Sequence, residues 1–183
     1  LVPHGPVRLN VLGFTDAPLR GDDLVKAQVI VRKGLDEGAV GLSTGLSYYP
    51  QSYSDTQELL GLCEPIKDLD RVYVTHVRNH NDERAEYGSG IDEALAIARI
   101  RDIKVHISHF MTRPASAGQV DELMAPIDKA KKMGADVTLE CYPYAANATI
   151  PGYFLRGEFH EGGIDALLQR LQQGDNRERL IDS

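Results

Sequence analysis

The chain has 183 residues, of which 42% are hydrophobic and 26% are charged, and its formal net charge is −7. This length and composition predict one globular α/β domain over residues 1–183 with a buried core. The acidic balance, without a cluster of Lys and Arg, argues against nucleic acid and anionic membranes as partners. No apolar run approaches the roughly 18 residues of a membrane-spanning helix, so we expect a cytoplasmic protein. The two cysteines, Cys63 and Cys141, are too few for a disulfide framework, and both are expected to be buried.

Apolar residues in the first part of the chain switch between a spacing of two and a spacing of 3.6, which predicts strands alternating with helices. Residues 7–13 have the alternation of a strand, and residues 22–39 are expected to form a helix that ends near Gly38. Residues 40–46 form the next expected strand. A helix over residues 54–69 follows, in which Ser54 and Gln57 have the spacing of a capping box.

The second part of the chain repeats this alternation. A strand over residues 71–77 precedes a helix over residues 90–102, and a strand over residues 104–110 precedes a helix over residues 120–133. The last expected strand covers residues 136–144, and a final helix covers residues 162–174. Strands that alternate with helices of this length pair in parallel through right-handed crossovers. The fold class is therefore α/β, with about five βα units.

Five βα units suit either an open doubly wound sheet or part of a (βα)8 barrel. After the first expected strand, the segment LGFTDAP has neither glycine-rich pattern of a phosphate-binding loop. In a barrel, the chemistry comes from the carboxyl ends of several strands. His76, His109 and Tyr142 stand at such ends, so we expect a partial TIM-like (βα)8 barrel.

The two strand-end histidines suggest a metal site. By strict alternation, His76 points the same way as Val72 and Val74, and His109 points the same way as Val105 and Ile107. If both columns face into a barrel, the two imidazoles lie about 5 Å apart on neighbouring strands and suit zinc. The pattern leaves a second interpretation open, in which each histidine is a hydrogen-bonded polar residue at a strand end.

Three other polar residues receive structural assignments from the same pattern. His106 has the opposite parity to His109 and is expected to face the helices. His4 is expected in a loop before the first strand, with a structural role. Glu140 shares the parity of Tyr142 and is expected to bond to its neighbours rather than to act in catalysis.

Five segments together resemble the N-acyl-D-amino-acid deacylases, or D-aminoacylases, of the amidohydrolase superfamily. In chain order they are VPHGPVR, EGAVGLSTGL, YVTHVRN, HISHF and DVTLECYPY, so the resemblance covers nearly the whole sequence. It implies a zinc-dependent barrel that cleaves the amide of an N-acyl-D-amino acid into a carboxylate and a D-amino acid. It also implies that His76 and His109 are zinc ligands, and that Tyr142 lies in the substrate pocket near the substrate carboxylate.

Two positions depart from the family pattern. The family usually has lysine two positions after the second histidine, where this chain has Met111. It usually has serine in the stretch after Y-P-Y, where this chain has Ala148. Because both lost groups hold substrate in the family, the resemblance leaves the acyl group and the amino acid open. Arg78 is a candidate to supply the missing charge as a substrate-binding residue.

The resemblance also implies that this chain is an internal portion of a longer enzyme. The early H-x-H pair, the metal-binding cysteine, the accessory β domain and the aspartate of a late strand, which serves as general base, have no counterpart in this sequence. A catalytic zinc takes about three protein ligands, so the isolated chain is expected to be inactive, with self-association through open sheet edges.

Two further functions stay open on the sequence alone. One is the opening of cyclic amides by a related barrel, as in hydantoinases and dihydroorotases. The other is a non-catalytic α/β domain that binds a small molecule, in which both histidines are structural. Replacing His76 and His109 distinguishes a metal-dependent enzyme from a non-catalytic domain, because only a metal site loses its metal when these residues are changed.

Overall fold

The structure is a computed structural model of the chain and describes residues 1–78, 83–112, 117–143, 146 and 148–176. Its strands are β1 (Val2–Pro3), β2 (Gly41–Gly45), β3 (Val72–His76), β4 (Lys104–Ile107) and β5 (Val137–Leu139). They form one parallel sheet in which the strands lie in chain order. A doubly wound sheet reverses its order at a switch point, whereas a barrel adds each strand beside the previous one. The parallel α/β prediction is confirmed, and the order is that of a partial barrel.

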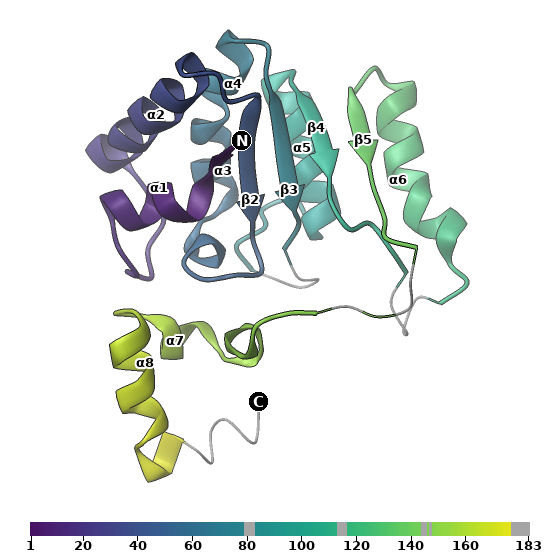
Figure 1. Cartoon of the computed structure of the whole chain (residues 1–183). Helices are drawn as coiled ribbons and strands as arrows, with labels where there is room; N and C mark the ends of the chain where they lie inside the picture. The colour runs from purple at the N-terminus through teal and green to yellow at the C-terminus, as the bar shows by residue number, and fades with distance from the viewer. Residues whose placement is uncertain (79–82, 113–116, 144–145, 147, 177–183) are drawn as a thin grey trace.

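Helices follow each of the five strands. They are α1 (His4–Val11), α2 (Gly21–Asp36), α3 (Thr56–Leu62), α4 (Glu64–Asp68), α5 (Gly90–Arg101), α6 (Val120–Lys132), α7 (Gly157–His160) and α8 (Ile164–Leu171), with the 3-10 turns η1 (Gln51–Tyr53) and η3 (Pro151–Phe154). In Figure 1, α3 and α5 lie behind the sheet, and α2 and α6 lie toward its two edges. In the described part of the chain, no helix lies in front of the sheet (Figure 1).

The hydrophobic core lies between the sheet and these helices. Tyr73 of β3 is paired with Leu42 of β2 and Val105 of β4, and all three are buried. Residues paired in register in a parallel sheet point to the same face, so this row faces the helices. The alternate residues, such as Val74 and its partner His106, are only half-buried. They define the open face of the sheet.

The predicted strand over residues 7–13 is wrong, because this segment is most of α1. His4, Val7 and Arg8 are buried at a spacing of three and four residues, while Leu9 is 41% exposed. This is the pattern of one helix face. A short apolar run fits both periods, and here contact with α2 and β2 selects the helix.

The predicted helix over residues 54–69 is present but begins and divides differently. Its N-cap is Asp55, whose side chain accepts a hydrogen bond from the backbone N–H of Glu58 at 3.0 Å. Ser54 instead donates to the backbone carbonyl of Gln51, so the predicted capping box is wrong. The helix ends at Leu62 and restarts at Glu64. Pro65 has no N–H to donate and fits the first turn of the second helix.

The C-terminal part of the described chain packs against the loop that follows β2. The hydroxyl of Tyr53 donates to the carbonyl of Gly157 at 2.7 Å. The rings of Tyr49 and His160 are stacked, with centroids 4.1 Å apart. Figure 1 shows α7 and α8 beyond the arrowheads of the strands, so this segment lies at the carboxyl edge of the sheet.

Two remaining expectations concern burial. Cys63 is buried as expected, whereas Cys141 is exposed, because β5 ends at Leu139 and Cys141 stands outside the sheet. Among the described residues, no helix is long and apolar enough to cross a membrane.

Candidate metal centre at the carboxyl edge of the sheet

His76 is the last residue of β3 and belongs to the open face of the sheet. It shares that face with Val72 and Val74, as the alternation predicted. Its backbone carbonyl accepts a hydrogen bond from Leu46 N at 2.9 Å, which ties it to β2. The ring of Tyr48, in the loop after β2, lies with its centroid 5.3 Å from that of His76. His76 is therefore held at the carboxyl edge from both its backbone and its side chain.

His109 reaches the same place by a turn rather than by strand alternation. Ile107, the last residue of β4, is fully buried on the helix side of the sheet, in register with Thr75. Regular alternation would send His109 to that side as well. Instead, His109 has a φ of 58°, a left-handed conformation uncommon for a residue with a side chain. The predicted inward column of Val105, Ile107 and His109 is wrong, because the turn redirects the last residue.

The turn brings the two predicted ligands together. The ring centroids of His76 and His109 are 5.5 Å apart, and the rings are inclined by 70°. Two imidazoles bound to one tetrahedral ion through nitrogens at about 2.0 to 2.1 Å have ring centres about 5 Å apart. The two histidines are therefore close enough to serve as two ligands of one metal ion. Within the described ranges, no group of three or more His, Cys, Asp or Glu side chains is arranged to hold a metal ion.

His106 faces the open side of the sheet, not the helices. It is in register with Val74 and Thr138, and its Nδ1 lies 2.8 Å from the Thr138 Oγ1. The expectation that it faces the helices is wrong, because it followed from the assumption that β4 remains extended as far as His109. His106 thus lies below the site on the open face, bonded to its neighbouring strand.

Tyr142 and Glu140 flank His109 on the side of β5. The ring centroids of Tyr142 and His109 are 5.5 Å apart. Glu140 Oε1 lies 3.7 Å from His109 Nδ1, and the two side chains are 54% and 48% exposed. This distance is too long for a hydrogen bond. The predicted neighbourhood of His109 and Tyr142 is present in the structure.

Sequence reasoning missed Tyr48 and Tyr153. Their ring centroids are 5.5 Å apart, so a continuous row of rings runs from Tyr153 through Tyr48, His76 and His109 to Tyr142. The signal for Tyr48 was present as the aromatic loop that follows G-L-S-T-G-L, and Tyr153 stands in the late segment that forms η3, but such segments have no period from which side-chain direction can be predicted.

Arg78 is directed into the protein. Its side chain is fully buried, and its Nε donates to Glu93 Oε2 at 2.9 Å. A role as a substrate-binding residue stays a prediction. Of the two positions that depart from the family pattern, Met111 is half-buried and Ala148 is exposed.

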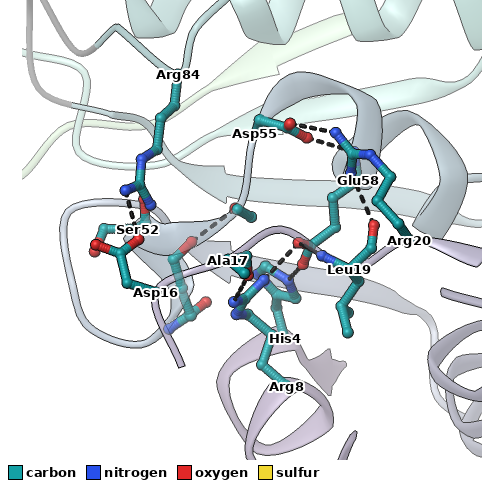
Figure 2. Close-up of polar contacts among 12 residues, drawn as sticks. His4, Arg8, Asp16, Ala17, Leu19, Arg20, Ser52, Asp55, Glu58 and Arg84 are labelled. Atoms are coloured by element: carbon teal, nitrogen blue, oxygen red, sulfur yellow. Dashed lines mark hydrogen bonds and ion pairs between the residues drawn. The ribbon is translucent and has the colours of Figure 1, made fainter. Parts of the chain in front are cut away.

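A second buried carboxylate, Glu58, lies at the beginning of α3 (Figure 2). It is fully buried and accepts hydrogen bonds from Leu19 N at 2.8 Å and from Arg8, and its Oε1 lies 2.7 Å from His4 Nε2. Burial lowers the pKa of His4, although its bond to Glu58 acts in the opposite direction. Burial alone would raise the pKa of Glu58, but the bonds from His4 and Arg8 outweigh it and lower that pKa. His4 is therefore structural, as expected, although it begins α1 rather than occupying a loop.

Comparison with known proteins gives relatives over most of the chain. An N-acyl-D-glutamate deacylase of Alcaligenes xylosoxydans xylosoxydans is 32% identical over 151 residues, 82% of this chain and 30% of the relative. A D-aminoacylase of the same organism is 29% identical over 152 residues, again 82% of this chain and 30% of the relative. No family model matches the chain.

Solved structures show the same relationship. An N-acyl-D-glutamate deacylase from Bordetella bronchiseptica, complexed with zinc and a phosphonate inhibitor, has a TM-score of 0.69 and 30% identity over 77% of this chain and 29% of that one. A D-aminoacylase described as defining a novel subset of amidohydrolases has a TM-score of 0.70 and 30% identity over 79% of this chain and 30% of that one.

The sequential parallel sheet, with two imidazoles meeting at its carboxyl edge, defines the chain as part of an amidohydrolase-type barrel. Within that class, most of its length is similar to part of the N-acyl-D-amino-acid deacylases, the family that its motifs indicated. It spans about 30% of the length of the curated relatives that it matches.

Proposed function

We propose that this chain forms a metal-binding portion of a zinc-dependent amidohydrolase that cleaves the amide bond of N-acyl-D-amino acids. In this proposal His76 and His109 hold the zinc ion, and further ligands and the general base lie outside the pair. The observation that carries it is the 5.5 Å separation of the two imidazole rings. Because the turn at His109 produces this separation, the backbone conformation itself places the two rings beside each other at the carboxyl edge of the sheet.

The surrounding residues define what this part of the barrel contributes. Zinc bound at such a site lowers the pKa of its water toward neutrality and polarises the amide carbonyl. Tyr142 stands beside His109 and is proposed to contact the substrate carboxylate. Tyr48 packs on His76 and closes the opposite side of the site, where it excludes water from the imidazole. Arg78 is buried, so we assign it no direct contact with substrate.

The test compares His76→Ala and His109→Ala with His106→Ala, a control that removes a histidine from the same face without touching the pair. Zinc affinity is measured by chelator competition, and hydrolysis of N-acetyl-D-amino acids is measured in a protein that contains this chain within a complete barrel. Replacing residues that only support zinc ligands costs about 10- to 100-fold in affinity or activity. Both ligand variants should lose more than that, and the control should retain both.

Several outcomes would contradict this proposal. Retention of full zinc affinity and turnover by His76→Ala and His109→Ala would show that the histidines are structural. Turnover of hydantoins in preference to N-acyl-D-amino acids would assign the site to cyclic amides. An equal loss in His106→Ala would mean that the site is not centred on the pair.

A further inference from the structure

We propose that Arg78 and Glu93 are positioning residues that hold His76 in place from behind the sheet. The inference rests on the proposed function for what His76 does, and on the structure alone for how His76 is held. It gives Arg78 a role different from binding substrate. The two roles predict different results when Glu93 is changed, because Glu93 is 1% exposed and cannot reach a substrate.

The ion pair is built into the interior of the protein. Arg78 donates from Nε to Glu93 Oε2 at 2.9 Å, and its other nitrogens reach the Ser52 carbonyl at 3.4 Å and the Ser54 hydroxyl at 3.3 Å. Glu93 accepts a second hydrogen bond from Thr56 Oγ1 at 2.6 Å. The Arg78 guanidinium therefore links the loop after β3 to η1. The Glu93 carboxylate, on α5, links that guanidinium to α3. A planar guanidinium satisfies these partners in a fixed orientation that lysine cannot reproduce.

The backbone between His76 and Arg78 leaves little room for movement. Ser47 Oγ donates to the Val77 carbonyl at 3.2 Å. A Cβ placed on Gly90, the first residue of α5, would lie 2.7 Å from both N and O of Arg78. The α5 terminus thus touches the Arg78 backbone directly, and only glycine fits there. Because Arg78 is two residues beyond His76, a shift of its side chain moves the end of β3.

Removing the Glu93 charge should release this arrangement. A buried guanidinium without its carboxylate is strongly unfavourable, so Arg78 should move toward solvent and take the end of β3 with it. Glu58 provides a matched control, because it is also a fully buried carboxylate, is paired with Arg8, and lies in the preceding βα unit. Glu58→Gln should reduce stability without displacing His76.

The first test uses the metal-free chain, labelled for NMR of its aromatic rings. The His76 ring should show nuclear Overhauser contacts with Tyr48 and His109 in the unchanged chain and in Glu58→Gln. These contacts should be lost or strongly weakened in Glu93→Gln and Arg78→Lys. Persistence of the contacts in Glu93→Gln, or their equal loss in Glu58→Gln, would overturn the proposal. If Glu93→Gln does not fold, Thr56→Val removes one hydrogen bond to Glu93 and should weaken the same contacts.

The second test measures zinc affinity by chelator competition, and kcat and KM in a complete barrel. Positioning residues should lower zinc affinity by about 10-fold and lower kcat with little change in KM, equally for Glu93→Gln and Arg78→Lys. A rise in KM for Arg78→Lys alone would identify Arg78 as a substrate ligand and overturn the inference. A complete barrel that binds no zinc would count against the proposed function, whereas the ring contacts in the metal-free chain would still decide the positioning role.

Discussion

Mild acid is expected to destabilise the chain through His4. This side chain is fully buried, and burial lowers its pKa below the ordinary value of 6.5. The folded chain therefore keeps His4 neutral at a pH where the unfolded chain takes up a proton. Stability rises with pH wherever the unfolded state binds more protons, so stability is lost as the pH drops through 6.5. This loss continues down to the lower pKa of the folded state.

The size of this effect follows from the one proton that the unfolded chain binds at His4 and the folded chain does not. The limiting slope is about 1.4 kcal/mol per pH unit. Because the unfolded histidine is half-protonated at pH 6.5 and largely protonated at pH 5.5, the loss between these values is at most about 1 kcal/mol, reached when His4 stays neutral in the folded chain. The pKa of Glu58 is lowered from 4.5, so its stabilisation is complete above 4.5 and is lost only at lower pH. The window from 6.5 to 5.5 thus separates His4 from Glu58, and the effect of His160, whose pKa burial also lowers, cancels when a His4 variant is compared with the unchanged chain.

The assay is urea unfolding, followed by circular dichroism at pH 7.5, 6.5 and 5.5, of the unchanged chain and of His4→Gln. Glutamine can still donate to Glu58 but does not titrate. The unfolding free energy of the variant should be lower than that of the unchanged chain at pH 7.5, and this difference should shrink by up to about 1 kcal/mol between pH 6.5 and 5.5. His106→Gln, on the open face, should leave that pH dependence unchanged. A gap that stays constant across the window would refute the reasoning.

Two further predictions follow from close contacts and from the open sheet. Gly90→Ala places a methyl group against the Arg78 backbone and should cost about 1–3 kcal/mol in urea unfolding. In contrast, Gly174→Ala meets no atom within 4 Å and should change stability little. The isolated chain should self-associate through its edge strand β5, so its sedimentation-average mass should rise with concentration. Thr138→Lys, which adds a charge to that exposed edge, should reduce the rise, and a constant monomer mass at all concentrations would contradict the prediction.

Periodicity predicted the fold where segments were long or strongly alternating. The helices over residues 21–36 and 90–101 and the strand that ends at His76 were all expected within a few residues. Residues 7–13 were assigned to a strand because a short apolar run satisfies both periods. Contact with α2 decides in favour of a helix there, and no local pattern contains that contact.

The site shows a different limit of sequence reasoning. His76 and His109 were identified as a pair, but the alternation that seemed to align them fails at His109. Strand parity assumes extended backbone up to the residue in question, and β4 ends two residues earlier at Ile107. The residue in the left-handed conformation is a histidine rather than a glycine or asparagine, so the sequence does not indicate a turn there. Family resemblance proposed His109 as the second ligand, and the backbone conformation explains why its ring lies beside that of His76.

Two buried carboxylates hold the carboxyl edge of the sheet, and neither contacts the positions at which this sequence departs from the family pattern. His4 follows β1 and is hydrogen-bonded to Glu58 near the start of α3, and Arg78 follows β3 and is paired with Glu93 near the start of α5. In both, a basic residue just beyond a strand is held by a carboxylate on a helix that begins at the same edge. Met111 and Ala148, where this chain departs from its family, are not among the partners of Glu58 or Glu93. Substitution at those positions therefore leaves the contacts of both carboxylates in place, including those of Glu93, which is proposed to position His76.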